Sequence, residues 1–230
     1  MKGYIFEISF FECFFKVPYT KKYRLSYPLP LPTSIAGIFG SILGIERERI
    51  KEIFKDFLFG ARIKDGTMFY ENVTLVEIDS ESSKKDRSKK DRSVEKIMIL
   101  NNPVYEIAIA GKNYKILDEI KDRINKFKME FLPFGGQNDF FLKNIKFIKE
   151  CEIGESDEIS GYVQKDLVKN INIIDKKEKK FWILPVKYKI GEDFRKVFFL
   201  FTSGKVKLKS KVLALDDIAL HPLEKFYFIV

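Results

Sequence analysis

The residues best suited to chemistry lie in one stretch near the N-terminus. No acidic residue occurs between Glu12 and Glu46, where four bases are interleaved with three tyrosines: Lys16, Tyr19, Lys21, Lys22, Tyr23, Arg24 and Tyr27. Aromatic rings can stack on unpaired bases and cations can meet phosphates, so this composition suits a single-stranded nucleic-acid surface. A solvated loop has the same composition, and the residues alone leave both interpretations open.

A second basic segment lies at residues 79–93, in which Lys-Lys-Asp-Arg-Ser is repeated at once over residues 84–93. Its bases are Lys84, Lys85, Arg87, Lys89, Lys90 and Arg92. Because the repeat has no apolar side chain, it cannot build a core, and we expect it to be mobile when free. It is either a tolerated insertion or an arm that orders on a polyanion. The net charge of +9 favours a polyanionic partner: RNA, DNA or an anionic surface.

Other reactive residue types are few. His221 is the single histidine and the only side chain that titrates near neutral pH unaided, and Cys13 and Cys151 are too few for a disulfide framework or a zinc site. Neither Gly-Lys-Ser/Thr nor G-x-G-x-x-G occurs, and we expect no metal and no cofactor. The apolar run 35–45 is too short to cross a bilayer, and the N-terminus has no signal-peptide pattern. We therefore expect a cytoplasmic protein with no membrane partner.

A proline-rich stretch organises the elements that must position these residues. Three prolines in five residues hold the chain extended before Thr33 or Ser34, either of which is predicted to cap a helix that Gly44 ends. Gly37 and Gly40 lie inside this helix, where each costs about 1 kcal/mol relative to Ala. We expect either tight packing on a sheet or the close approach of a strand or ligand to explain them.

The hydrophobic pattern predicts an α+β fold with a ferredoxin-like (RRM-like) βαββαβ order over residues 1–150, interrupted by the basic arm. Its predicted elements are strand 4–11, helices 33–44 and 46–57, strand 59–64, a hairpin turn at Asp65-Gly66, strand 67–78, strands 94–100 and 104–110, helix 113–128 and strand 144–151. A second, β-rich lobe is predicted over 151–230, with strands at 160–168, 181–189, 196–201, 205–213 and 226–230. In this lobe Lys205, Lys207, Lys209 and Lys211 share one strand face, for edge protection or for phosphate contact.

Three motifs resemble those of the CRISPR-associated Cas family five, of the RAMP superfamily. Residues 31–44 resemble that family's N-terminal signature, in which a proline and a Ser/Thr precede a glycine-punctuated helix that ends in Leu-Gly. Residues 59–63 are similar to the strand that follows. Residues 133–138, a glycine turn predicted to expose N–H donors and two amides, lie where the superfamily has its glycine-rich loop. The resemblance covers about the first 150 residues.

This resemblance implies a subunit of a type I surveillance complex (Cascade), acting in antiviral defence, that grips the 5′ handle of the CRISPR RNA. The segment 79–93 lies where the family has a thumb that pinches the RNA and contacts the backbone subunit; the backbone and large subunits are the expected protein partners. Together with the residue pattern, it predicts these RNA-binding residues: Lys16, Tyr19, Lys21, Lys22, Tyr23, Arg24, Thr33, Ser34, Arg62, Lys84, Lys85, Arg87, Lys89, Lys90, Arg92, Gly135, Gly136, Gln137 and Asn138.

The alternative function is a metal-independent endoribonuclease that processes precursor CRISPR RNA, because one lineage of the family cuts RNA with Tyr, Lys and His side chains. Such chemistry needs a base for the 2′-hydroxyl and an acid for the leaving oxygen. The candidates would be His221, Tyr23 and Lys22, but no motif ties the histidine to either partner. We therefore expect a non-catalytic subunit.

Overall fold

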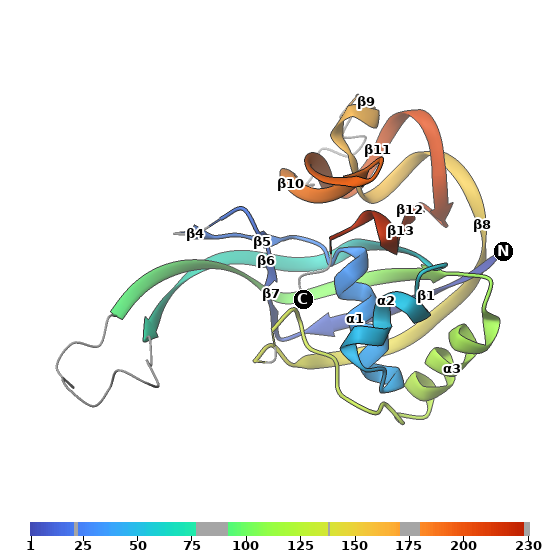
Figure 1. Ribbon diagram of the computed structural model, residues 1–230, viewed down its shortest axis with the longest axis horizontal. Coiled ribbons are helices and arrows are strands. Elements are labelled where there is room, and N and C mark those ends of the chain that lie inside the picture. Colours follow the sequence, from blue (N-terminus) through green and yellow to red (C-terminus); the bar gives the residue numbers. More distant parts are fainter. Residues whose placement is uncertain (21–22, 77–91, 138, 171–179, 228–230) are drawn as a thin grey trace.

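The computed structural model describes residues 1–20, 23–76, 92–137, 139–170 and 180–227. The chain is mixed α/β, mostly sheet with few helices (Figure 1). The larger elements of the first part are β1 (Lys2–Phe10), α1 (Pro32–Leu43), α2 (Arg47–Ile53), β6 (Leu58–Val76), β7 (Arg92–Ala110), α3 (Tyr114–Asn125) and β8 (Leu142–Gln164). Their strands lie in the sheet order β8-β1-β7-β6, with antiparallel neighbours throughout.

Short strands lie between β1 and α1 and are the elements that position the candidate site. They are β2 (Glu12–Cys13), β3 (Phe15–Lys16), β4 (Tyr23–Arg24) and β5 (Ser26–Tyr27). The second part contains β9 (Val168–Asn170), β10 (Phe181–Ile190), β11 (Asp193–Leu215), β12 (Ile218–Ala219) and β13 (His221–Pro222), with 3-10 turns η1 (Lys165–Leu167) and η2 (Leu223–Lys225).

The hairpin turn predicted at Asp65-Gly66 is wrong. β6 continues through both residues and pairs with β7 along its whole length, with irregular register on either side of Asp65. Gly66 has φ +139°, and a Cβ there would lie 3.0 Å from the Cα of Pro103, while Asn102 has φ +47°. The two turn-like signals therefore face each other across the ladder and form one bulged region inside a long hairpin.

The predicted start of α1 is also wrong, because the helix begins one residue earlier, at Pro32. Leu31 is the N-cap, and neither Thr33 nor Ser34 makes a capping bond. Proline suits the first helical position, since its φ is already helical and it has no N–H to leave unpaired. The predicted end at Gly44 is confirmed, in the left-handed conformation with φ +71°.

The interior glycines of α1 differ from each other. A Cβ on Gly40 would lie 3.0 Å from a side-chain carbon of Ile50 in α2, so this glycine allows two helices to pack. A Cβ on Gly37 would meet no atom within 4 Å. Of the two expected explanations, neither packing on a sheet nor the close approach of a strand is seen: Gly40 faces a side chain of α2 and Gly37 faces open space.

The core extends across residue 150, the expected domain boundary. β8 pairs with β1 through its first half and with β11 through its second half. A single buried cluster includes Phe6 and Phe39 from the first part and Phe199 and Phe201 from the second. The boundary therefore lies inside a strand and between residues that share one core.

The predicted strand at 181–189 is confirmed as β10, whereas the strands at 196–201 and 205–213 form one continuous strand, β11. The strand predicted at 160–168 is the end of β8 followed by η1 and the start of β9. At the C-terminus Phe226 forms an isolated bridge with Tyr188, and residues 228–230 lie outside the described chain. The alternating lysines of β11 are exposed, while Val206 and Leu208 between them are buried.

Candidate nucleic-acid interface

The outer half of the β6–β7 hairpin projects from the body of the molecule (Figure 1). Two short N-terminal strands pair along it. β2 lies antiparallel to β7 at Asn101 and Leu100, and β4 lies parallel to β7 at Lys96 and Ile97. The strands that lead to the predicted arm and the basic–aromatic N-terminal segment thus belong to one sheet.

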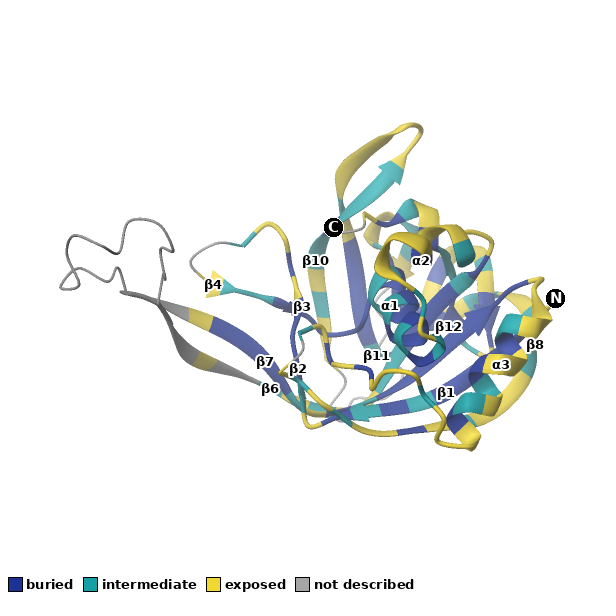
Figure 2. Cartoon of the chain, turned by 60° about the horizontal axis from the view of Figure 1, so that its bottom comes forward, coloured by how far each residue is buried: buried dark blue, intermediate teal, exposed yellow. Residues whose placement is uncertain are grey.

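A small apolar cluster holds this assembly together. Phe14, between β2 and β3, packs with Ile97 and Ile99 of β7, and Phe140 of the loop after α3 packs against them. Figure 2 shows buried positions of β7 continuing beneath β2 and β4. Burying these side chains fixes the N-terminal segment on the hairpin, because slipping the register by one residue would turn the apolar side chains to solvent.

The glycine turn is a packing device for the same segment. A Cβ on Gly135 would lie 2.5 Å from the Cβ of Cys13. Gly136 has φ +94°, and a Cβ there would clash with the carbonyl oxygen of Phe14. The Phe14 N–H donates to the carbonyl of Gly135 at 2.8 Å. Glycine is therefore required at both positions, because the backbone of 12–14 lies directly on the turn.

The N–H donors of the two glycines are not free, contrary to prediction. The N–H of Gly135 donates to the carbonyl of Phe140 at 2.7 Å, and that of Gly136 to the carbonyl of Phe134 at 3.0 Å. Gln137 is partly buried and accepts the N–H of Phe140 through its carbonyl at 3.0 Å. The turn consequently supports the interface rather than offering backbone donors to a phosphate.

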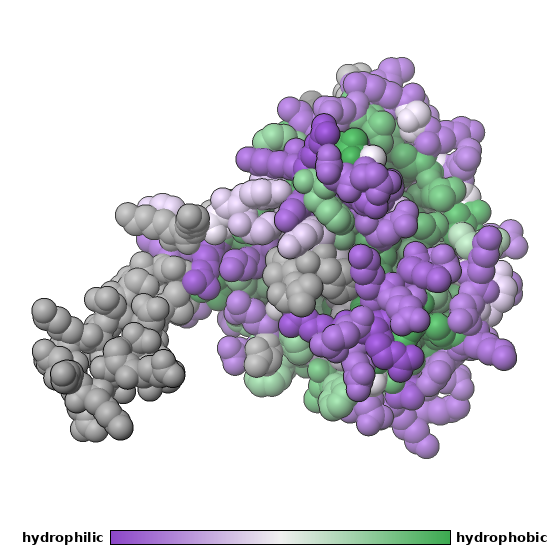
Figure 3. Space-filling model, viewed as in Figure 1, coloured by the Kyte–Doolittle hydropathy of each residue, from purple (hydrophilic) through white to green (hydrophobic). Residues whose placement is uncertain are grey.

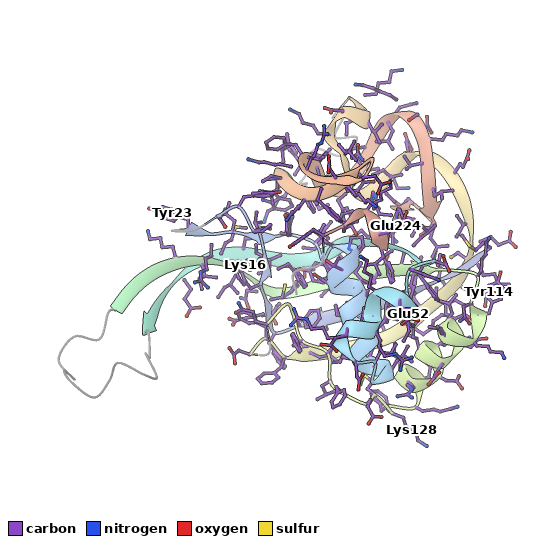
Figure 4. The ribbon with its side chains drawn as sticks, viewed as in Figure 1. Lys16, Tyr23, Glu52, Tyr114, Lys128 and Glu224 are labelled. Atoms are coloured by element: carbon purple, nitrogen blue, oxygen red, sulfur yellow. The ribbon has the colours of Figure 1, made fainter. Side chains whose placement is uncertain are left out.

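Four of the predicted residues come together with one that the sequence did not suggest. Lys16, Tyr19 and Tyr23 are exposed and Arg24 is partly exposed. Lys96, opposite Tyr23 on β7, is also exposed. We call these five residues the arm-base surface. Figure 4 shows Lys16 and Tyr23 on the side from which the hairpin projects, and Lys128 at the bottom of the body.

The loop that carries these side chains is closed by its own hydrogen bonds. The N–H of Val17 donates to the carbonyl of Leu25 at 2.8 Å. The hydroxyl of Thr20 donates to the carbonyl of Val17 at 3.0 Å and accepts the N–H of Leu25 at 3.2 Å. These bonds use the polar groups at the base of the loop, so the exposed rings and ammonium groups are presented from a fixed frame.

Tyr27 does not join the other two tyrosines. Its ring is buried and stacks on Phe201 at 5.5 Å, and its hydroxyl donates to the carbonyl of Pro185 at 2.7 Å. Burial raises the pKa of this hydroxyl well above its usual value. Tyr27 therefore joins the N-terminal segment to β10 and is a core residue.

Arg62 lies away from the arm-base surface, in a network of acids. Its guanidinium donates to Glu106 at 2.6 Å and to Asp217, and its other nitrogen lies 3.5 Å from Asp216. Glu106 also lies 3.3 Å from the ammonium group of Lys64. The three carboxylates already satisfy the charge of Arg62, which favours a structural role, and its RNA contact stays a prediction.

The remaining predicted residues lie at the start of α1, at the start of β7 or outside the described part of the chain. Thr33 and Ser34 lie in the first turn of α1 and are partly exposed. Lys21, Lys22, Asn138 and the arm bases Lys84, Lys85, Arg87, Lys89 and Lys90 lie outside the described residues, and Arg92 begins β7. Their RNA contacts stay predictions.

His221 is partly buried among aromatic side chains at the other end of the hairpin. Its ring stacks on Tyr162 at 4.9 Å, and Nε2–H donates to the carbonyl of Tyr162 at 2.9 Å. Burial lowers the pKa of His221 to about 4. The imidazole is therefore neutral at physiological pH, with its proton engaged by a backbone carbonyl.

Two of the proposed nuclease residues, His221 and Tyr23, are not assembled in one place, and the third, Lys22, lies outside the described residues. His221 pairs with Phe59 of β6, which faces Ile109 of β7, whereas Tyr23 pairs with Lys96. At roughly 3.3 Å per residue, about 40 Å of strand separates the two pairing positions. Direct proton transfer requires hydrogen-bond reach or one bridging water, so His221 and Tyr23 cannot act on the same phosphodiester.

Comparison with known proteins identifies the family of this chain. A family model described as CRISPR-associated protein (Cas_Cas5) matches residues 4–188, which is most of the chain. The chain belongs to the CRISPR-associated Cas5 family. The matched region includes β2–β4, the projecting hairpin and nearly all of β10; β11 lies beyond it.

Among the similar solved structures, a chain with a TM-score above 0.5 supports the fold. A chain from a CRISPR RNA-guided surveillance complex is 12% identical, with 90% of this chain and 91% of that chain covered and a TM-score of 0.55. A CRISPR-associated protein is also 12% identical, covering 91% and 94%, with a TM-score of 0.45. A chain of a type III-B Cmr-beta complex bound to cognate target RNA is 11% identical, covering 89% and 86%, with a TM-score of 0.44. Curated proteins give no match.

Two features are absent from the described part of this Cas5-family chain: a cluster of metal ligands and a membrane-spanning helix. In the described ranges, no three His, Cys, Asp or Glu side chains converge as ligands for a metal ion. None of the helices that the structure describes is long and apolar enough to cross a membrane. The side chains that sequence analysis missed are Lys96 and, beyond the matched region, Lys196, whose ammonium group lies 5.3 Å from the ring centroid of Tyr19. Only the tertiary structure reveals either one.

Proposed function

We propose that this Cas5-family chain is a non-catalytic subunit of a type I CRISPR surveillance complex (Cascade) and that its arm-base surface binds the 5′ handle of the CRISPR RNA. One observation carries the proposal: the basic–aromatic segment is built into the same sheet as the strands that lead to the basic arm. Exposed rings and cations then line the base of that arm, the combination that unpaired RNA requires.

The rest of the assignment extends this interpretation. The sheet order β8-β1-β7-β6 with intervening helices supports a ferredoxin-like arrangement, in which β6 and β7 lead to the arm. The arm would act as the thumb that reaches RNA and the backbone subunit, and the large subunit would be a further neighbour. A cytoplasmic location follows from the proposed partners.

The distance between Tyr23 and His221 along the hairpin supports a binding role over cleavage. Neutral His221 has its N–H on a backbone carbonyl, and its stacked neighbours leave it in an aromatic core. These contacts give the histidine a structural role.

The test compares two double variants of the purified chain. Lys16→Ala with Tyr23→Ala removes one cation and one ring from the arm-base surface. Lys128→Ala with Tyr114→Ala removes the same groups from exposed positions elsewhere (Figure 4). The probe is a labelled RNA whose sequence is read from the 5′ end of the RNA that co-purifies with the complex.

We expect the first variant to bind the handle about tenfold more weakly or worse, because it lacks one stacking ring and one phosphate-binding cation, and its salt slope should fall by about 0.7. The control should bind like the wild type. Labelled repeat RNA incubated with the wild type in EDTA should stay intact. Equal affinities for the two variants would reject the arm-base surface, and specific cleavage that His221→Phe abolishes would replace binding by the endoribonuclease alternative.

A further inference from the structure

The β10–β11 hairpin has one face in the core and a second face that is largely in solvent, apart from Leu200, which is buried in a second cluster. Trp182, Leu184 and Val186 of β10 pack on the core cluster, as does Val197 of β11. Because side chains alternate along a strand, the intervening residues face outward. The outward residues are Phe181, Ile183, Lys187, Phe194, Lys196 and Phe198, which we call the β10–β11 face.

This face is unusually aromatic for an exposed surface. The side chain of Phe198 is 48% exposed, that of Phe181 is 45% exposed, and Phe194 is also exposed. Tyr227 adds a fourth exposed ring, 5.4 Å from Phe194 in an edge-to-face arrangement. Leaving several large rings in contact with water is unfavourable, so such a patch commonly marks a binding surface.

Cations lie directly against these rings. The ammonium group of Lys196 lies 5.4 Å from the ring centroid of Phe198 and 5.3 Å from that of Tyr19. The ammonium group of Lys187 lies 3.3 Å from the ring centroid of Tyr227. Neither lysine has a carboxylate partner among the described residues. Both charges are thus held over aromatic surface and are available to an anion.

The acids of the hairpin are confined to its turn. No acid occurs within Phe181–Ile190 or between Phe194 and Leu215. At the turn, Glu192 pairs with Lys189 and Asp193 with Arg195. The face therefore has a net positive charge with rings between its cations, which complements the alternating phosphates and bases of a single strand.

We propose that the β10–β11 face binds unpaired nucleotides of RNA, which stack on Phe198 and Phe194 while Lys196 and Lys187 meet the flanking phosphates. The contact between Tyr19 and Lys196 joins this face to the arm-base surface. A strand leaving the arm-base surface can therefore continue onto the hairpin. The identity of the nucleic acid as RNA rests on the proposed function; the face itself rests on the contacts above.

The family match ends at residue 188, inside β10, so Phe194, Lys196 and Phe198 lie outside the region that this chain shares with the family model. The other members of the face, Phe181, Ile183 and Lys187, lie inside the matched region. A protein partner is the competing occupant. Charge favours RNA, since an acid-free face with two uncompensated lysines repels most basic RNA-binding proteins and attracts a phosphate backbone.

The test measures binding of a labelled oligouridine of about a dozen nucleotides, which exceeds the few nucleotides that one stacking surface occupies. Phe198→Ala with Lys196→Ala removes one ring and one cation from the face. Phe131→Ala with Lys128→Ala is the matched control at exposed positions in the segment after α3. Phe198→Tyr with Lys196→Arg keeps both the ring and the charge. Thermal unfolding of all variants verifies that the fold is unchanged.

We expect the first variant to bind oligouridine about tenfold more weakly, because it can make neither the stack on residue 198 nor the phosphate contact of residue 196. The control and the conservative variant should bind like the wild type, and an RNA duplex of equal length should bind all four proteins alike. Unchanged oligouridine affinity in the first variant, while Lys16→Ala with Tyr23→Ala still weakens handle binding, would overturn this inference and leave the proposed function standing. Normal RNA binding with loss of other Cas subunits on co-purification would overturn it in favour of a protein interface.

Discussion

The two ends of the β6–β7 hairpin belong to the same pair of strands but differ in how their reactive side chains are bound. At the inner end, Arg62 is bound by three acids and His221 is stacked on Tyr162. At the outer end, Tyr23 and Lys96 lie side by side and exposed. On the face shown in Figure 3, hydrophilic side chains cover much of the body, so polarity alone does not distinguish the two ends.

The two ends differ in whether the fold itself provides bonding partners for the reactive side chains. Each reactive group at the inner end has a fold-provided partner: carboxylates for the guanidinium and a carbonyl for the imidazole. In the arm-base surface, Lys16, Tyr23 and Lys96 are instead exposed to solvent. A group with its bonding capacity satisfied within the fold contributes to stability, whereas an exposed cation beside an exposed ring is available to a ligand. The following variants test that separation, in order of decreasing effect on the free energy of unfolding.

Arg62→Met should have the largest effect. It leaves Glu106 and Asp217, both mostly buried, without their main counter-charge, which we expect to lower the free energy of unfolding by about 3 kcal/mol. Urea denaturation measures this loss. Lys149→Met is the matched control, because its pair with Asp216 is more exposed and should matter by less than about 1 kcal/mol. A stable Arg62→Met protein with weakened RNA binding would place Arg62 in the interface and remove the contrast between the two ends.

His221 should make stability depend on pH. The pKa of His221 is about 4 in the folded chain, against the ordinary histidine value of 6.5 that applies to the unfolded chain. Between these two pH values the unfolded chain therefore binds more protons than the folded chain. Stability should therefore fall as pH is lowered through this window, by up to about 3 kcal/mol from this residue. His221→Phe keeps an aromatic ring on Tyr162 and removes the titration. The difference in unfolding free energy between variant and wild type should shift in favour of the variant from pH 7 to pH 4.5; a constant difference would show that the imidazole is not desolvated.

Much of the fold could be read from local patterns. The apolar stripe of Ile116, Leu117, Ile120, Ile124 and Phe127 predicts a helix that the structure confirms as α3, although the helix ends at Asn125 and Phe127 is exposed. The left-handed glycine at Gly44 ends α1 as expected. The Asp65-Gly66 signal failed because register is fixed by pairing with β7. Asn102, the residue with positive φ in the facing part of β7, is too distant in sequence to be included in a rule that predicts turns from adjacent residues.

The site was harder to predict, because the deciding partners are remote in sequence. Tyr23 and Tyr27 lie in the same acid-free segment of the sequence, yet only Tyr27 contacts Phe201 and is buried in the core. The acid that pairs with Arg62 at Asp217 is 155 residues away. Residue type and local charge therefore suggested four of the five residues of the arm-base surface, whereas Lys96 and the acidic partners of Arg62 required the tertiary structure.

Neutralising the arm should have the smallest effect on stability. Replacing Lys84, Lys85, Arg87, Lys89 and Lys90 with Ser keeps the chain length and leaves the β6–β7 pairing residues unchanged. Because the replaced segment has no apolar side chain to bury, we expect the free energy of unfolding to change by less than about 0.5 kcal/mol. Affinity for the handle RNA should fall, and the salt slope should decrease by about 0.7 for each phosphate that is no longer neutralised. Trypsin gives a second measure: the wild-type arm should be cut first in the free chain and be protected in the assembled complex. Loss of stability without loss of RNA affinity would mean that these bases serve the fold, as the inner end of the hairpin does, and the outer end would no longer be the binding end.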